Sequence, residues 1–170
     1  FRQALSWQFD QILVLGAGFD TRVLRFHHEA GTTRMFELDV PITQDAKTSQ
    51  YRKRGLTIPP NLTFISIDFD KELLSTKLKE AGFARDVRSL FILEGLLMYL
   101  QPESVDALFR IIHEFSGVGS EVVFDSVHAS VLRHENLFFG EEDILKTVSK
   151  AGEKWQFGIE RNRIDDFLKT

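Results

Sequence analysis

Residues 11–22 read QILVLGAGFDTR, and this stretch decides the fold expected for the rest of the chain. The unbroken apolar run at residues 12–15 is typical of a parallel strand that is covered on both faces. Gly16 and Gly18 allow a sharp turn that brings the backbone close to a ligand, and residues 19–26 predict a helix after it. A strand, a glycine turn and a helix together open a nucleotide-binding unit, although Gly-x-Gly alone is a weak signal.

The composition indicates a soluble globular protein and excludes several kinds of site. The 170 residues suffice for one domain, 1–170, and a net charge of −4 argues against a broad nucleic-acid surface. The chain has no cysteine, which excludes disulfides, thiolate nucleophiles and zinc sites built on cysteine. The longest apolar stretch, residues 90–100, is too short to cross a bilayer. We therefore expect a cytoplasmic protein with no nucleic-acid or membrane partner. Because it begins at Phe1, we also expect a fragment.

Predicted strands and helices alternate along the chain. Hydrophobic periodicity and turn residues predict strands at residues 11–15, 33–38, 62–67, 88–93, 121–124 and 155–159. They predict helices at residues 1–9, 19–26, 41–53, 71–81, 102–115, 141–150 and 162–169, with Asp70 capping the fourth of these. This alternation predicts an α/β fold, with a Rossmann-like, doubly wound, mostly parallel sheet and helices on both faces.

Acidic residues follow the predicted strands at the edge where such sheets bind ligands. Asp39 lies about 20 residues past the glycines, where a carboxylate can accept hydrogen bonds from ribose hydroxyls, and Glu37 is the second choice. An ordinary loop aspartate is an equally good interpretation of Asp39. Asp68 can accept from an adenine amino group with Phe69 beside the ring, or it can be a simple turn residue.

Glu94 stands between two apolar segments, and burying a carboxylate is costly unless a partner pairs with it. A bound ammonium group or N–H donor would serve as that partner, and the alternative is a distant arginine or water. Four strand ends thus place one glycine turn and several carboxylates at a single edge, which is a stronger indication than any one member.

The residues after the glycines favour one cofactor over another. The dinucleotide fingerprint requires glycine at the position of Thr21, and Asp20 beside it would repel a pyrophosphate. S-adenosylmethionine carries an adenosine, an ammonium group and a sulfonium but no phosphate, so it suits this acidic edge better than NAD. Arg22 can meet the methionine carboxylate, although a surface or strand-paired arginine is at least as good an interpretation. An NAD-dependent oxidoreductase and a catalytically inactive cofactor-binding module remain alternatives.

Three ordered motifs, LGAGFDTR at 15–22, FELDVP at 36–41 and EGLLMYL at 94–100, resemble the leucine carboxyl methyltransferase family. This family is a branch of the class I S-adenosylmethionine-dependent methyltransferases and includes bacterial enzymes similar to polyketide O-methyltransferases. The resemblance implies O-methylation of a carboxylate or hydroxyl, on a small molecule or a carboxyl-terminal peptide. Members also carry an N-terminal helical segment that helps close the site and a final antiparallel strand, and we expect this chain to lack both. The predicted cofactor-binding residues are Gly16, Ala17, Gly18, Asp20, Arg22, Glu37, Asp39, Asp68, Phe69 and Glu94.

The sequence assigns no catalytic residue and no metal site. A carboxylate acceptor is already ionised near neutral pH and needs no general base, whereas a hydroxyl acceptor would need one. His128 is the histidine considered for that role, but a solvated loop histidine is the better interpretation. Tyr99 and the pair 138–139 are candidates to line a substrate pocket, with core packing as the favoured alternative. The oligomeric state stays open.

Overall fold

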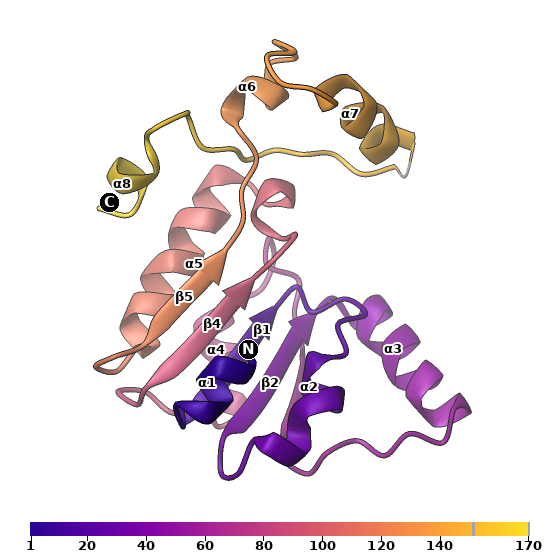
Figure 1. Ribbon diagram of the computed structural model, residues 1–170, viewed down its shortest axis with the longest axis vertical. Coiled ribbons are helices and arrows are strands. Elements are labelled where there is room, and N and C mark those ends of the chain that lie inside the picture. Colours follow the sequence, from indigo (N-terminus) through magenta and orange to yellow (C-terminus); the bar gives the residue numbers. More distant parts are fainter. Residues whose placement is uncertain (151, 170) are drawn as a thin grey trace.

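The computed structural model describes residues 1–150 and 152–169, and its centre is a parallel sheet of five strands (Figure 1). The strand order is β3-β2-β1-β4-β5, and every neighbouring pair is parallel. The chain therefore winds outward from β1 in both directions, and the switch point of such a sheet, between β1 and β4, is where ligands bind. The strands are β1 (Gln11–Leu15), β2 (Arg34–Asp39), β3 (Leu62–Ser66), β4 (Ser89–Leu93) and β5 (Glu121–Phe124).

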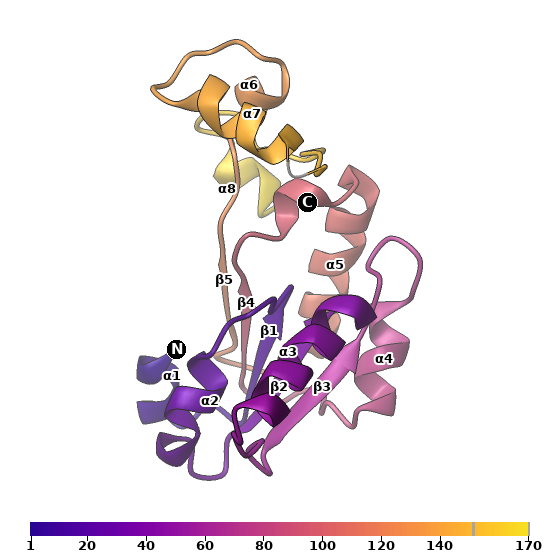
Figure 2. The ribbon, with the colours of Figure 1, turned by 90° about the vertical axis from the view of Figure 1, so that its right-hand side faces the viewer.

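Helices cover both faces of this sheet (Figure 2). One face carries α4 and α5, and the other carries α1, α2 and α3, with α3 held over two strands because Gln44 donates to the carbonyls of Glu37 and Ile65. The helices are α1 (Arg2–Ser6), α2 (Arg22–Phe26), η1 (His27–Glu29), α3 (Pro41–Lys53), α4 (Leu74–Glu80), η2 (Leu97–Tyr99), α5 (Pro102–Phe115), α6 (Ala129–Leu132), α7 (Glu141–Lys150) and α8 (Ile164–Phe167).

The burial of β1 explains its unbroken apolar sequence. Leu13 and Leu15 face one hydrophobic cluster, with α4 and α5, while Ile12 and Val14 face the other, with α1 and α2. All five residues of the strand are buried. The predicted doubly wound parallel sheet is confirmed, and the consecutive apolar residues 12–15 are those of a strand covered on both sides.

The structure corrects several predicted elements. Three helices are shorter than predicted, since α1 ends at Ser6, α2 begins at Arg22 and α8 spans Ile164–Phe167. Residues 155–159 form no strand, because Gln156 N donates to Met98 O at 2.6 Å while Phe157 packs against the main core; Ile159 makes only an isolated bridge to His128. The fourth helix begins at Leu74 and not at residue 71, with Leu73 at its N-cap position.

The predicted capping role of Asp70 is accordingly wrong. Its carboxylate accepts a hydrogen bond from Ser104 at 2.7 Å, at the start of α5. The turn before α4 is held instead by Asp68, whose carbonyl accepts from the amides of Lys71 and Glu72. Side chains also close this turn, since Asp70 N donates to Asp68 Oδ1 at 3.2 Å and Asp68 N donates to Glu72 Oε2 at 2.9 Å. Such local side-chain bonds compete with helix formation, and the helix starts one turn later.

The segment that contains α6 and α7 lies beyond the carboxyl ends of the strands (Figure 2). Among the described residues, no helix combines the length and apolarity needed to cross a membrane. The carboxyl edge of the sheet is therefore bordered by the glycine turn after β1, the ends of β2 and β4, and this additional segment.

Candidate cofactor site

The turn after β1 depends on its glycines. Gly16 and Gly18 adopt φ values of +64° and +45°, in the left-handed region that favours glycine. A side chain at Gly16 would also lie 3.0 Å from Leu96 Cδ1. The amide of Ala17 donates to Leu38 O at 2.8 Å, which fixes the turn against the end of β2. The backbone is thus open to close approach by a ligand.

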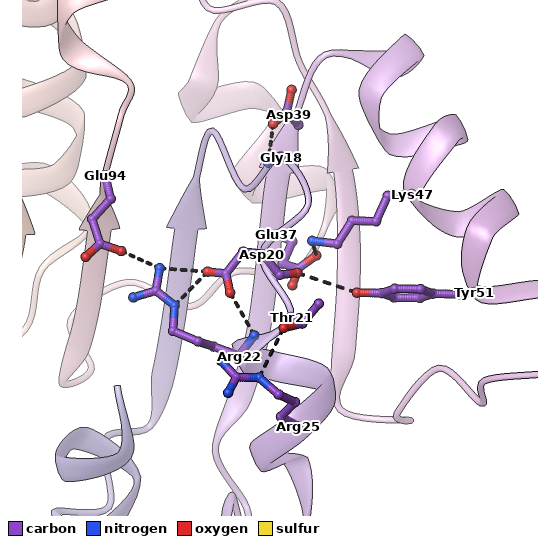
Figure 3. Close-up of polar contacts among 10 residues, drawn as sticks. All are labelled: Gly18, Asp20, Thr21, Arg22, Arg25, Glu37, Asp39, Lys47, Tyr51 and Glu94. Carbon is purple, nitrogen blue, oxygen red and sulfur yellow. Dashed lines mark hydrogen bonds and ion pairs between the residues drawn. The ribbon is translucent and has the colours of Figure 1, made fainter. Parts of the chain in front are cut away.

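Asp39 connects this turn to the end of β2 (Figure 3). Its Oδ2 accepts from Gly18 N at 2.6 Å, and its Oδ1 accepts from Val40 N at 2.7 Å. A carboxylate has about four lone-pair sites, so Asp39 can still accept from the hydroxyls of a ligand. Both the geometry of the turn and a free acceptor capacity therefore depend on this side chain.

Arg22 joins the glycine turn to the end of β4. Its Nε and Nη2 each lie 2.7 Å from Asp20 Oδ2, and Nη2 also contacts Glu94 Oε2 (Figure 3). Burial alone would raise the pKa of Asp20, but the hydrogen bonds and charge of Arg22 hold that pKa below its usual value. The side chain of Glu94 is 47% exposed, so the predicted buried carboxylate is wrong and its partner within the chain is Arg22.

A cavity of about 220 Å³ opens between these groups, at the switch point of the sheet. It brings together five of the ten residues predicted from the sequence, namely Gly16, Ala17, Asp20, Arg22 and Glu94. Its remaining lining comes from Val14 and Arg25.

Glu37 lies on the same face of β2 as Asp39 but below the surface. Its side chain is 1% exposed, and its Oε2 lies 2.6 Å from Nζ of Lys47, itself 2% exposed. Burial raises the pKa of Glu37 to about 7, and the charge and hydrogen bond of Lys47 only partly oppose this. Such burial leaves Glu37 no surface to offer a ligand, which argues against the direct contact predicted for it.

Asp68 and Phe69 follow β3 at the same edge, since Ile67 N donates to Asp39 O at 2.9 Å. The carboxylate of Asp68 pairs with Lys71 at 2.6 Å, and this bond lowers the pKa of Asp68. Phe69 packs against the hydrophobic cluster under α4 and α5. Their predicted role at an adenine ring stays a prediction.

Two residues of this site escaped the sequence interpretation. Lys47 and Tyr51 are buried on α3, and the Tyr51 hydroxyl lies 3.5 Å from Asp20 O. A signal was present, because Gln44, Lys47 and Tyr51 recur at helical spacing on an otherwise exposed helix. Polar residues at those positions hide the buried face from a search for apolar stripes.

Of the residues considered for an acceptor pocket, His128 and Phe138 lie in the segment beyond the sheet, whereas Tyr99 is the last residue of η2, shortly after β4. His128 stacks on Phe138 with ring centroids 4.9 Å apart and an interplanar angle of 19°. Tyr99 O accepts from the Gln156 side chain at 2.8 Å. Across residues 1–150 and 152–169, no three histidine, aspartate or glutamate side chains are grouped to hold a metal ion.

Solved structures share this architecture. An O-methyltransferase family protein from Burkholderia thailandensis superposes with a TM-score of 0.66, at 11% identity, over 97% of this chain and 46% of that one. Identity this low shows the fold alone. The switch-point cavity and the parallel sheet therefore belong to a protein with the class I methyltransferase fold.

The family follows from the sequence match. The model of the family described as leucine carboxyl methyltransferase matches residues 1–113, and the chain belongs to this family. "Putative S-adenosyl-L-methionine-dependent methyltransferase YktD" of Bacillus subtilis is 28% identical over 160 residues, covering 94% of this chain and 52% of the relative. A "Putative S-adenosyl-L-methionine-dependent methyltransferase" of Mycobacteroides abscessus is 37% identical over 117 residues, covering 69% of this chain and 38% of the relative. The chain spans about half the length of the first of these relatives and less of the second.

Proposed function

We propose that this chain is the cofactor-binding domain of an S-adenosylmethionine-dependent methyltransferase that methylates an oxygen of a carboxylate or hydroxyl acceptor. The observation that carries the proposal is that the glycine turn, held by Asp39 through Gly18 N, meets the Arg22–Glu94 pair around one cavity at the switch point. The family membership and the names of both relatives support it.

The residues at this edge fit the chemical groups of the cofactor. Asp39 would accept from the ribose hydroxyls with its remaining lone pairs, and Arg22 would meet the methionine carboxylate. Glu94, half exposed and already turned toward the cavity, would accept from the ammonium group. Asp68 and Phe69 are assigned to the adenine. Gly16 and Gly18 keep the backbone clear for close approach, whereas Glu37 supports the site from below.

Bound S-adenosylmethionine would supply an electrophilic methyl group on a sulfonium. The residues of this chain contribute by fixing the cofactor at a rigid sheet edge, and positioning of this kind accounts for a large share of the rate in group transfer. A carboxylate acceptor is ionised near neutral pH and needs no general base. Because no general base is assigned in this chain, we favour a carboxylate acceptor over a hydroxyl acceptor.

An NAD-dependent oxidoreductase fits less well. The carboxylate of Asp20 lines the cavity at the turn where a pyrophosphate would lie, and Glu94 adds a second negative charge. Arg22 and Arg25 balance these charges, so the stronger argument is the turn itself, which carries Thr21 where the dinucleotide fingerprint requires glycine.

Two measurements test the function. Titration calorimetry with S-adenosylmethionine and its demethylated product should show one binding site. Transfer of a labelled methyl group to cell metabolites and peptides should then yield products that release methanol in mild alkali, as carboxyl methyl esters do and methyl ethers do not. Absence of cofactor binding would overturn the proposal, and binding without transfer to any acceptor would support an inactive binding module.

A further inference from the structure

A buried polar cluster lies directly beneath the glycine turn and is formed by Glu37, Lys47 and Tyr51 (Figure 3). Glu37 and Lys47 form an ion pair of 2.6 Å with almost no exposed surface. In the part of the chain that the structure describes, Glu37 Oε1 has no hydrogen-bond partner. Nothing in this cluster lines the cavity of about 220 Å³ itself.

Such a cluster is poorly explained by stability. A buried ion pair costs so much desolvation that apolar residues of similar volume often stabilise a fold as well or better. An unpaired carboxylate oxygen adds to that cost. The position of the pair, and not its contribution to folding, therefore needs an explanation.

The cluster contacts the turn through Tyr51. Its hydroxyl lies 3.5 Å from the carbonyl of Asp20, at the outer limit of a hydrogen bond, and Asp20 in turn holds Arg22. Glu37 also precedes Asp39 by two residues, so both side chains lie on one face of β2. The cluster therefore lies next to Asp20 and Asp39, the two residues whose side chains hold the turn.

We propose that Glu37 and Lys47 are positioning residues that set the electrostatic charge beneath the cofactor turn, so that proton uptake by Glu37 disfavours the positively charged cofactor. The inference rests on the proposed function and adds a regulation to that same site. With Glu37 ionised, the pair is neutral. With Glu37 protonated, the charge of Lys47 is no longer balanced by Glu37, and the charge below the site is more positive by one unit.

The groups that face Glu37 support this assignment. From α3 come Lys47 and Tyr51, from the turn comes Asp20, and from the end of β2 comes Asp39. The neighbours of Glu37 in the sheet are the apolar Val14 and Phe64, which offer it no proton or charge. Burial raises the pKa of Glu37 to about 7, so the change of charge falls near neutral pH.

The test compares two ligands that differ in charge. S-adenosylmethionine carries the sulfonium, and S-adenosylhomocysteine has the same shape without the methyl group and its charge. Affinities for both are measured by calorimetry between about pH 5.5 and pH 8.5. The ratio of affinities, sulfonium ligand over neutral ligand, cancels titrations that affect both ligands equally.

In the wild-type protein the ratio should rise at least about threefold with pH, with a midpoint near that of Glu37. Glu37→Gln should make the ratio independent of pH. Lys47→Met should move the midpoint upward, because Lys47 lowers the pKa of Glu37. Lys53→Met, on the exposed end of the same helix, is the matched control and should behave as wild type. A purely structural role would change stability without moving the midpoint.

A flat ratio in the wild type, or an unchanged profile in Glu37→Gln, would overturn the inference. If Glu37→Gln does not fold, the pKa of Glu37 is followed in the wild type by ¹³C carboxylate resonances. Reciprocity requires the sulfonium ligand to lower that pKa more than the neutral ligand does, and equal shifts would overturn the inference. Failure of the wild type to bind either ligand at any pH would instead contradict the proposed function.

Discussion

Asp39 divides its two carboxylate oxygens between the amides of Gly18 and Val40, and so controls the geometry of the turn as well as an acceptor site. We expect Asp39→Ala to weaken cofactor binding at least about tenfold, since it removes charge-assisted bonds on both sides. Calorimetry measures this. The free energy of unfolding should fall by only about 1–2 kcal/mol.

Asp45→Ala, in the exposed part of α3, is the matched control for Asp39→Ala and should leave the affinity unchanged. Equal affinities in Asp39→Ala and Asp45→Ala would exclude Asp39 from the site.

A substitution at Glu94 should affect cofactor binding much more than stability. The Glu94 side chain is half exposed, and its ion pair with Arg22 is partly exposed as well. Glu94→Gln should change the free energy of unfolding by less than about 0.5 kcal/mol, as exposed ion pairs contribute little. It should nevertheless weaken binding of S-adenosylmethionine several-fold. Chemical denaturation measures the free energy of unfolding, and calorimetry on the same preparation measures the affinity. A large loss of stability with unchanged affinity would contradict the role given to Glu94.

The pKa of Glu37, raised from an ordinary 4.5 to about 7, makes stability depend on pH. Between these values the folded state holds a proton that the unfolded state has lost, so the contribution is favourable in acid and disappears as pH rises through 7. We expect the wild type to lose stability from about pH 5.5 to pH 8 and Glu37→Gln to lose less. Denaturant midpoints at both pH values measure this. If the wild type and Glu37→Gln lost the same stability between the two pH values, Glu37 would not titrate in this range.

Single residues also mark the limit of sequence interpretation. The glycine turn and the acidic strand ends were recognisable because they lie next to strands with clear apolar patterns. The Arg22–Glu94 contact was not, since it joins residues far apart in sequence through the β1–β4 pairing. Lys47 was missed for a related reason, because a buried lysine in a polar helix looks like a surface residue until its partner is known.

At the scale of elements, the turn between β1 and α2 packs against the segment after β4. Gly16 and Gly31 both have positive φ, but a side chain would meet Leu96 at 3.0 Å only in the case of Gly16, as nothing lies within 4 Å of a side chain at Gly31. We expect Gly16→Ala to lower the melting temperature more than Gly31→Ala. Only Gly16→Ala should weaken cofactor binding.

Gly31→Ala controls for backbone strain, which costs about 1–2 kcal/mol in either variant. Thermal unfolding without ligand gives the melting temperature, and the increase in melting temperature with ligand reports cofactor binding. Equal losses of affinity in the two variants would mean that strain alone, and not the close packing of the turn, shapes the site.

Helices whose first residue is a proline were predicted with the correct start. Pro41 and Pro102 each stand at the first position of a helix, and α3 and α5 begin there. The strand predicted at 155–159 was wrong. Trp155, Phe157 and Ile159 alternate with polar residues as in a strand, but the segment packs Phe157 onto the core and makes only an isolated bridge. Periodicity reports which side chains are buried, but not what the backbone pairs with.

At the scale of the whole molecule, the sequence predicted a parallel doubly wound sheet but not its strand order, because several orders obey the same right-handed connection rule. The placement of α6 and α7 beyond the sheet could not be predicted, because residues 128–140 carry no regular pattern. The chain spans about half the length of one of its two relatives and less of the other.

The most direct test of the cofactor site is a crystal structure of the protein with bound S-adenosylhomocysteine. We expect the ribose hydroxyls within about 2.6–3.2 Å of the Asp39 carboxylate and the amino-acid portion of the ligand between Arg22 and Glu94. A ligand bound elsewhere, such as in the apolar cavity of about 320 Å³ between α5, β5 and α8, would contradict the account.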